Sequence, residues 1–596
     1  MCSYRIVCAC KRQIMKIFLR YLNAALLLAA FAPALAQLPE PGANSGRSNT
    51  FGSHVDLVLV PVNVTDSKGH HVSGLKMESF HLSENGKQQA LGLFEEITAR
   101  KIDPDSAQSA APVEGFSNFA ARNTHVRRMT VLVLDLLNTP SIFQPQARKE
   151  LMKYLSKSLD NDEPIALLGI DGRGLWQIHS FTTNTKVLIE ALHRIRGKLS
   201  ATEMNDNDNA SNDSASTAAL LDPAISGTVD RFEDFFSETM TGMAAMDQRD
   251  ATRRTLTGLS QIALAFAGIP GRKTLIWATA GFPFMIDDPS SIAYMGLDMI
   301  GRYEQTWRAL MSANVAVYPV DLQGVLPKYQ NRSSTGTNSS ASGRGGPVKA
   351  ADVNRRSLQP WTRAMPYDQQ FERQKTMEAF AAATGGITCM NFNDLAKCFE
   401  KAASDSSSYY LLGFYLSPDD RKPGWRKVKV DVTERGTRVR AREGFYVGEP
   451  PKENEEARKA AIAAALTSPV EFTGVPMNVQ WTGRTESSPA AGGQIVSAKF
   501  SVTVPAPLFT LEGTDSGLVD LLFSAVAFNE KGREVAEISK TFVERLDAKS
   551  IAQVRRAGFA YQGVINYPAG TKEVRFAIRN NSSGDIGSVV APVEAR

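Results

Sequence analysis

Three oxygen-bearing side chains follow an apolar run in the segment TVLVLDLLNTP, where Asp135 ends the run and Asn138 and Thr139 come shortly after it. The apolar run predicts a buried strand, and the amphipathic pattern beyond it predicts a helix. Carboxylate, amide and hydroxyl oxygens on such a loop are ligands of the kind that Mg²⁺ prefers. The segment therefore predicts either a cation site or a loop in which Asp135 and Thr139 cap the helix and accept hydrogen bonds from loop amides.

A second carboxylate, Asp321, ends the apolar run VAVYPVD. Strand-like and helix-like segments alternate around both acids, which predicts a mostly parallel α/β sheet covered by helices on both faces. The turn at Asp171–Gly174, inside EPIALLGIDGRGLWQIHSF, predicts a hairpin that adds one antiparallel edge strand. Parallel strands end at one edge of a sheet, so Asp321 is expected at the same edge as Asp135.

The first 36 residues contain five basic residues, no acidic residue and the apolar run ALLLAAFAPALA. This pattern predicts a secretory signal peptide (1–36) followed by a flexible lead (37–54), and the alternative is a retained anchor helix. Removing five of the 67 basic residues leaves 62, which balance the 62 acidic residues. A neutral mature chain gives no electrostatic argument for a nucleic-acid partner. The predicted signal peptide indicates export to the periplasm or the exterior, and no later segment is long and apolar enough to cross a bilayer.

The α/β domain is placed at residues 127–405. Two Asn/Ser/Gly-rich inserts interrupt it, near 201–247 and 328–358, and their composition predicts disorder. Of the five cysteines, only Cys389 and Cys398 follow the predicted cleavage site. In an oxidising compartment they either form a disulfide or remain two buried thiols, and sequence leaves both open because it does not show their Cα separation.

Two β-rich segments flank the α/β domain, namely an N-terminal unit at 55–98 and a return segment at 406–448. A linker at 99–126 joins the N-terminal unit to the α/β domain. Each segment is too small to bury its own core, so we expect the two to form one sandwich into which the α/β domain is inserted. A helical connector (449–468) then leads to residues 469–596, where short strands and turn signals predict a β-sandwich of immunoglobulin-like type.

The motifs GRKTLIWATAGFP, ANVAVYPVDLQG and TGGITCMNFNDL follow the strand that ends in Asp135, and in this order they resemble the von Willebrand factor type A (VWA) domain. The stretches VPVNVTDSKGHHVSGLKMESFHLSENGKQQALGLFEE and SYYLLGFYLSPDDRKPGWRKVKVDV resemble the secreted bacterial subgroup of VWFA-related, acidobacterial-type proteins. The resemblance implies a doubly wound, Rossmann-like domain flanked by β-sandwich units. It also implies a metal-ion-dependent adhesion site at the carboxyl ends of the strands.

In that family the site is built from Asp-x-Ser-x-Ser on the first loop, a Thr on a second loop and an Asp on a third. Asp135 matches the first position of this pattern, and Thr139 stands at the position of the last Ser. Leu137 stands at the position of the first Ser and has no oxygen to offer. The third loop reads Thr-Ala-Gly, with Ala280 at the position of the acid. We therefore expect a degenerate adhesion site.

Other side chains offer partial replacements for these missing ligands. Asn138 and Asp321 offer compensating oxygens, and Thr239 or Thr241 is a candidate for the Thr of the second loop. Mg²⁺ gives up its water reluctantly, so a site that lacks one carboxylate and one hydroxyl should bind it much more weakly. We expect no resident cofactor, and the alternative is Mg²⁺ bound at low affinity.

Motifs of common enzymes are missing from the sequence, which has no G-x-S-x-G and no H-E-x-x-H pattern, and its seven histidines suggest no catalytic triad. We therefore expect a non-enzymatic protein of the cell envelope or exterior that interacts with or adheres to another protein. The alternative is a secreted carbohydrate-binding or hydrolytic protein that uses its β domains.

Overall fold

A computed structural model describes the compact unit His54–Arg596 in part. The described residues are 57–98, 115–118, 128–157, 163–195, 246–269, 271–282, 298–324, 367–416, 422, 424–447, 454–486, 494–505 and 516–593. The expected signal peptide and lead, Thr239 and Thr241 and almost all of the two inserts lie outside these residues.

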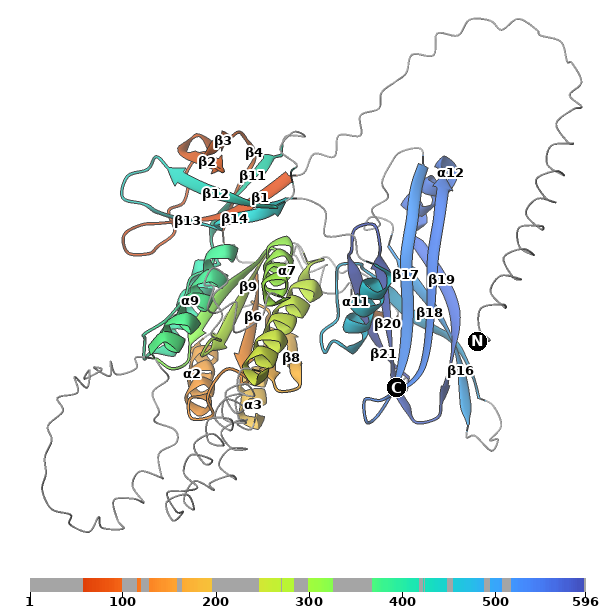
Figure 1. Cartoon of the computed structure of the whole chain (residues 1–596). Helices are drawn as coiled ribbons and strands as arrows, with labels where there is room; N and C mark the ends of the chain where they lie inside the picture. Colours follow the sequence, from red (N-terminus) through yellow and green to blue (C-terminus); the bar gives the residue numbers. More distant parts are fainter. Residues whose placement is uncertain are drawn as a thin grey trace, which may run out of the picture. The chain divides into compact units, whose positions relative to one another are not determined.

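The α/β domain is built on a five-stranded sheet with the strand order β10-β9-β6-β7-β8 (Figure 1). The strands are β6 (Arg128–Asp135), β7 (Ile165–Asp171), β8 (Gly174–Thr182), β9 (Arg272–Thr279) and β10 (Val315–Asp321). Neighbouring strands from β10 to β7 run parallel, and β8 is the antiparallel edge strand, as the Asp171–Gly174 turn predicts. The expected mixed α/β class is confirmed.

Helices cover both faces of this sheet because both faces of its strands are apolar. In β6 the side chains of Val131 and Val133 join one core, and those of Leu132 and Leu134 join the other. The first core is covered by the helix at 246–266 with α7 (Asp298–Ser312) and α9 (Tyr367–Thr384), and the second by α2 (Gln144–Lys157), α3 (Thr185–Arg194) and α10 (Leu395–Asp405).

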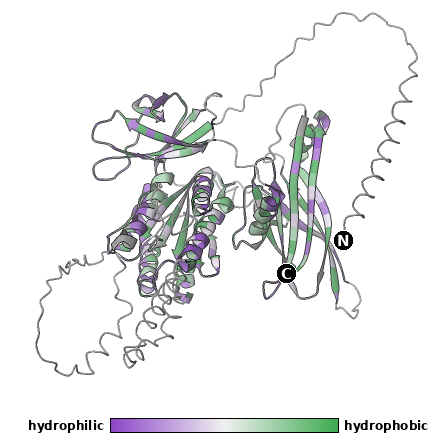
Figure 2. Ribbon diagram, in the orientation of Figure 1, coloured by the Kyte–Doolittle hydropathy of each residue, from purple (hydrophilic) through white to green (hydrophobic). Residues whose placement is uncertain are grey.

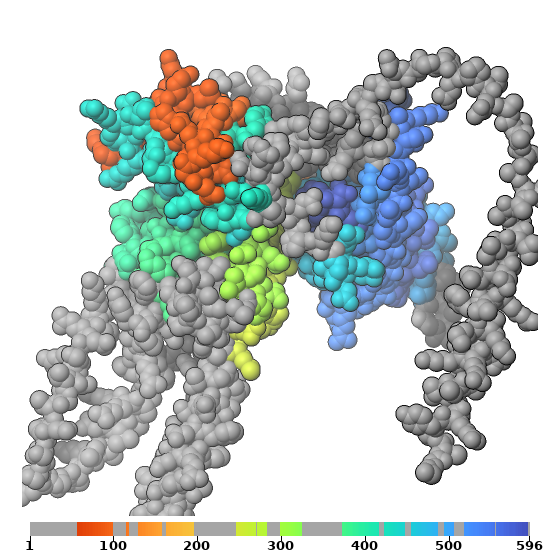
Figure 3. Space-filling view, turned by 45° about the horizontal axis from the view of Figure 1, so that its top comes forward, coloured from red at the N-terminus to blue at the C-terminus, as the bar shows by residue number. Residues whose placement is uncertain are grey.

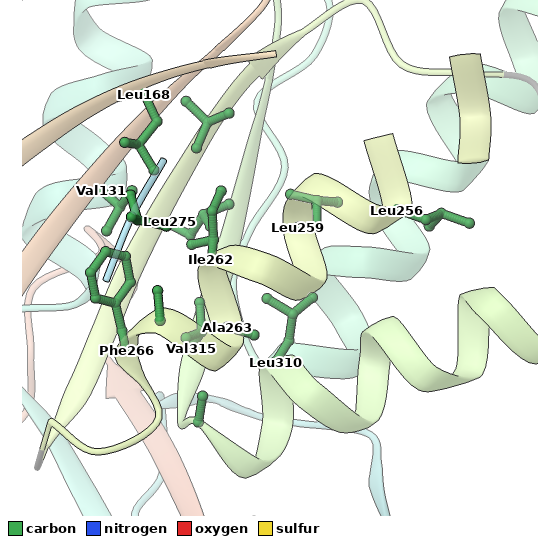
Figure 4. Close-up of a cluster of buried hydrophobic side chains, with 14 of the residues drawn as sticks. Val131, Leu168, Leu256, Leu259, Ile262, Ala263, Phe266, Leu275, Leu310 and Val315 are labelled. Carbon is green, nitrogen blue, oxygen red and sulfur yellow. The ribbon is translucent and has the colours of Figure 1, made fainter. Parts of the chain in front are cut away.

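The helix at 246–266 shows how the sequence pattern creates this packing. Its apolar residues Leu256, Leu259, Ile262 and Phe266 recur every three or four positions and form one stripe. Figure 4 shows this stripe beside Leu275 and neighbouring strand residues of the sheet. In Figure 2 the strands of this sheet are likewise mostly green, the colour of hydrophobic residues.

The segments on either side of the α/β domain are hydrogen-bonded to each other. β1 (Leu57–Thr65) pairs with β11 (Tyr409–Tyr415) and with β13 (Arg438–Ala441) in the sheet β13-β1-β11-β4. A facing sheet has the order β14-β12-β2-β3. Its strands and β4 are β2 (Phe80–Glu84), β3 (Lys87–Gln89), β4 (Leu91–Ile97), β12 (Gly424–Val432) and β14 (Gly444–Val447). Figure 3 shows the two sequence segments in contact, and together they bury one core.

The C-terminal region forms a second sandwich, with sheets β19-β16-β15-β5 and β18-β17-β20-β21 around a shared core. Its elements are α11 (Glu455–Thr467), β15 (Asn478–Glu486), β16 (Ile495–Val504), β17 (Ser516–Asn529), β18 (Glu534–Asp547), α12 (Ala548–Ala557), β19 (Phe559–Pro568), β20 (Thr571–Asn580) and β21 (Ile586–Pro592).

One strand of this second sandwich comes from the expected linker at 99–126. β5 (Phe116–Ser117) pairs with β15, and Asn118 donates hydrogen bonds to the carbonyl oxygens of Phe472 (2.6 Å) and Val475 (2.9 Å). Its side-chain oxygen accepts from the backbone amide of Met477 at 2.8 Å. A linker is therefore the wrong description of residues 115–118, which are part of the C-terminal sandwich.

Candidate functional site

Asp135 lies at the carboxyl end of β6, in the middle of the α/β sheet, and its side chain is fully buried. One carboxylate oxygen accepts a hydrogen bond from the backbone amide of Asn138 at 3.0 Å. The other accepts from Asn138 Nδ2 (2.8 Å), Thr279 Oγ1 (2.8 Å) and Trp277 Nε1 (3.1 Å). Four donors from the first loop and from β9 therefore converge on one carboxylate.

Burial raises the pKa of the Asp135 carboxyl, because the charged form is taken out of water. The hydrogen bonds from Asn138, Thr279 and Trp277 act in the opposite direction, since they stabilise the carboxylate. The carboxylate is thus kept in the interior by the donors of its own chain.

Asn138 is also buried, and its amide nitrogen bridges two parts of the domain. Besides Asp135, Nδ2 donates to Thr255 Oγ1 at 2.8 Å, on the helix at 246–266. The Thr255 hydroxyl in turn donates to the carbonyl of Ala251 at 3.0 Å. A carboxylate only accepts hydrogen bonds, so Asn138 must turn its nitrogen and not its oxygen toward Asp135. This orientation is the opposite of the one that a cation ligand needs.

Thr139 is fully buried, and its hydroxyl has no hydrogen-bond partner among the described residues. The backbone of this loop is held by Gln144, the first residue of α2, whose side chain donates to the carbonyls of Leu136 (3.3 Å) and Thr139 (2.8 Å). Asp135 and Thr139 were both expected to accept hydrogen bonds from loop amides. The Asp135 carboxylate does so, and the Thr139 hydroxyl does not.

Asp321 ends β10 and lies opposite Thr279 of β9 in the parallel register, so it shares the sheet edge with Asp135. Its side chain is 2% exposed, and one of its oxygens accepts from the backbone amide of Gln323 at 2.9 Å. Burial raises the pKa of this carboxyl to about 6. The edge thus holds two buried carboxylates on strands that flank β9.

Arg373 of α9 reaches the same edge, and no sequence pattern indicated it. Its side chain is 4% exposed, and Nη1 donates to the carbonyl of Gly281 at 2.9 Å. Burial lowers the pKa of the guanidinium to about 10, and the charges of Asp135 and Asp321 act in the opposite direction. The long insert before α9 separates Arg373 from the strands in sequence, so spacing gives no signal for this contact.

The residues of this edge do not fit a divalent cation. Both oxygens of Asp135 accept hydrogen bonds, Asn138 presents its nitrogen, and the side chains of Leu137 and Ala280 are buried and apolar. Mg²⁺ requires near-octahedral oxygen ligands, which this arrangement does not offer. Within the ranges that the structure describes, no cluster of three or more His, Cys, Asp or Glu side chains is placed to hold a metal ion.

Cys389 and Cys398 form a disulfide with a Cα–Cα distance of 5.8 Å. Cys389 extends the sheet, since its amide donates to the Pro319 carbonyl and its own carbonyl accepts from the Asp321 amide, both at 2.9 Å. The disulfide therefore ties the loop beyond this extension to α10, at the same edge as Asp321.

Two loops of this carboxyl edge present large apolar side chains to solvent. Ile142, on the loop between β6 and α2, is 65% exposed, and Phe392, within the disulfide loop, is 49% exposed. The two carboxylates of the edge are buried while these two apolar side chains are exposed, so the described loops offer apolar contact area. No protein-family model matches the chain, and no curated protein matches it.

Proposed function

We propose that the chain is an exported protein-interaction protein whose α/β unit is a VWA-type domain, and that it binds another protein without catalysing a reaction. The strand order β10-β9-β6-β7-β8 supports this proposal, with parallel strands, one antiparallel edge strand and an aspartate at the end of the middle strand. The two sandwiches then serve as flanking domains, and we retain the immunoglobulin-like type for the C-terminal one as part of the proposal.

The observation that carries the proposal is the contrast between the buried and exposed groups of the carboxyl edge. The carboxylate of Asp135 accepts four hydrogen bonds from its own chain, whereas about half or more of the surface of Ile142 and of Phe392 is exposed to solvent. Exposed aliphatic and aromatic side chains are typical anchors of protein interfaces. We therefore place the partner on these loops and expect its binding to be independent of divalent cations.

Export is part of the same proposal and rests on the signal-like first 36 residues. Among the described residues, the structure has no helix with the length and apolar character needed to cross a membrane. The disulfide between Cys389 and Cys398 supports an oxidising compartment such as the periplasm or the exterior.

The test is a capture experiment with three single variants of the tagged mature chain, residues 37–596. Ile142→Asp and Phe392→Asp each place a charge in the proposed interface, and Val543→Asp is the matched control, because Val543 on β18 is 65% exposed, like Ile142. Proteins of an envelope extract from the producing cell are cross-linked to each chain and quantified by mass spectrometry.

We expect the recovery of one partner to fall about tenfold or more with the Ile142 and Phe392 variants, since burial of one such side chain contributes about 1.5–3 kcal/mol. The Val543 variant and a chelator should leave its recovery unchanged. Equal loss in all three variants, or loss with the chelator, would contradict the proposal. Recovery of a polysaccharide and no protein would instead favour the carbohydrate-binding alternative.

A further inference from the structure

Arg373 is in direct contact with the third loop of the carboxyl edge. Gly281 has a φ of +72°, and a Cβ built on it would lie 2.9 Å from the backbone oxygen of Arg373 and 3.2 Å from its Cβ. The close approach requires glycine at this position, because a larger residue would push α9 away from the loop. α9 is therefore packed against the loop at the very residue that bears the guanidinium.

A chain of hydrogen bonds links this guanidinium to Asp135. Arg373 Nη1 donates to the Gly281 carbonyl at 2.9 Å, and the Gly281 amide donates to Thr279 Oγ1, also at 2.9 Å. The Thr279 hydroxyl then donates to the Asp135 carboxylate at 2.8 Å. The last two bonds share the Thr279 hydroxyl and polarise each other, whereas Arg373 binds a separate peptide group of the same loop residue.

The charges of the edge favour a cation at this place. Asp135 is fully buried and Asp321 is 2% exposed, and a buried carboxylate without a compensating positive charge is strongly unfavourable. Both carboxylates interact electrostatically with Arg373, whose guanidinium does not lose its proton in proteins. Its Nε is buried without a hydrogen-bond partner among the described residues, so the arginine is held there by charge and packing as well as by its one bond to Gly281.

We propose that the Arg373 guanidinium is the resident cation of this sheet edge and compensates the Asp135 and Asp321 carboxylates in the way that a bound divalent cation would. A guanidinium that belongs to the chain does not dissociate and leaves no coordination position open to a partner's carboxylate. The edge is then held in one state at any concentration of divalent cation. This inference concerns the charges inside the domain and stands apart from the identity of any partner.

The test is a double-mutant cycle on the mature chain with Arg373→Met and Asp321→Asn, because Asn keeps an oxygen for the Gln323 amide. Hydrogen exchange followed by mass spectrometry reports opening of the peptides at 276–282 and 372–384, and a peptide at 519–529 in the C-terminal sandwich serves as internal reference. Arg302→Met, at an exposed position of α7, is the matched control for loss of an arginine.

Arg373→Met should raise the opening equilibrium constant of the two edge peptides about 100-fold or more, since it leaves buried carboxylates uncompensated. In the Asp321→Asn background only the Asp135 carboxylate remains to be compensated, so the effect of the same change should be smaller by about fivefold or more. Arg302→Met should change neither peptide, and the reference peptide should be unaffected throughout. An equal effect of Arg373→Met in both backgrounds would show that the arginine does not compensate the Asp321 carboxylate, and would overturn the proposal.

Arg373→Lys covers the case in which Arg373→Met does not fold, because it retains the charge and loses the fork geometry. We expect the Lys variant to fold and to keep the opening constant of the edge peptides within about tenfold of the wild type. A Lys variant that also fails to fold would refute a role in charge compensation. Calorimetry of the wild type with Mg²⁺ or Mn²⁺ gives an independent check, since saturable binding that Asp135→Asn abolishes would equally refute it.

Discussion

Replacing Lys273 by Met should stabilise the protein at neutral pH, and the gain should disappear as the pH rises. Lys273 lies in β9 and is 2% exposed, and its Nζ donates to the Ile269 carbonyl at 2.6 Å, just beyond the helix at 246–266. Burial lowers the pKa of this ammonium group from 10.5 to about 7. Lys273 is therefore protonated in the unfolded chain at pH values where it is neutral in the folded chain.

The sign and size of the effect follow from this difference in pKa. Between pH 7 and pH 10.5 the unfolded state holds a proton that the folded state has released, so the free energy of unfolding rises with pH. The 3.5 pH units between 10.5 and about 7, at 1.36 kcal/mol each, give a penalty of about 5 kcal/mol at pH 7 and below, which vanishes above pH 10.5. Met fills a similar volume and removes this penalty, but it loses a hydrogen bond that contributes about 1.5–3 kcal/mol. The net gain is then about 2–3 kcal/mol at pH 7. At pH 9.5 the penalty has fallen to about 1.4 kcal/mol, so the balance lies between about zero and a loss of about 1.5 kcal/mol.

Urea unfolding of the wild type and of Lys273→Met between pH 7.0 and pH 9.5 measures this difference, and other titrating groups cancel because both chains contain them. Lys149→Met, at an exposed position of α2, is the control for simple loss of a charge. A difference between wild type and Lys273→Met that stays constant within about 0.5 kcal/mol over this range would refute the reasoning. A Met variant that is less stable than the wild type at pH 7 would refute it as well.

Three further changes test the other contacts on which the fold of these domains depends. Gly281→Ala should lower the free energy of unfolding by about 1–3 kcal/mol in a denaturant titration, because of its positive φ and its contact with Arg373. Reducing the disulfide, or replacing Cys389 and Cys398 by Ser, should cost about 2–3 kcal/mol for a sequence separation of 9, and reductant should leave the melting temperature of the Ser variant unchanged. Asn118→Ala should speed proteolytic cleavage near residues 115–118 several-fold, since it leaves buried backbone groups of the C-terminal sandwich unpaired; an unchanged cleavage rate would mean that β5 is held by other contacts.

The sequence was most informative where burial imposes a strong pattern. The strands that end in Asp135 and Asp321 are apolar on both faces and alternate with amphipathic helices, so their order and their parallel edge followed from simple rules. The hairpin at Asp171–Gly174 was equally clear, because tight-turn residues interrupt two apolar runs.

Short or distant contacts left no such pattern. β5 has only the residues Phe116 and Ser117, and no periodicity can be detected over so short a strand. Its role depends on the amide of Asn118, which binds backbone groups more than 350 positions further along the chain. Arg373 was missed for the same reason, since its contact with Gly281 spans 92 positions and a long insert.

The sandwich around the insertion shows why its two halves depend on each other. β1 lies between β11 and β13, so both of its hydrogen-bonded neighbours come from the segment that follows the α/β domain. The N-terminal β unit therefore cannot complete its sheet until more than 300 residues later in the chain, and its folding must wait for contacts of high sequence separation.

Asp135 shows how a single residue type can mislead when its donors are not considered. An aspartate at the end of a central parallel strand suggests a cation, but here Trp277 and Thr279 of the neighbouring strand supply two of its four hydrogen bonds. These residues precede Ala280, the position where the resemblance would place a second acid. The aspartate has hydrogen-bond donors beside it, and an apolar residue stands at the position of the second acid. Both features favour a sheet edge whose carboxylate is hydrogen-bonded within the chain and not bound to a cation. The side chains around a carboxylate thus distinguish a metal site from a structural one more reliably than the carboxylate itself.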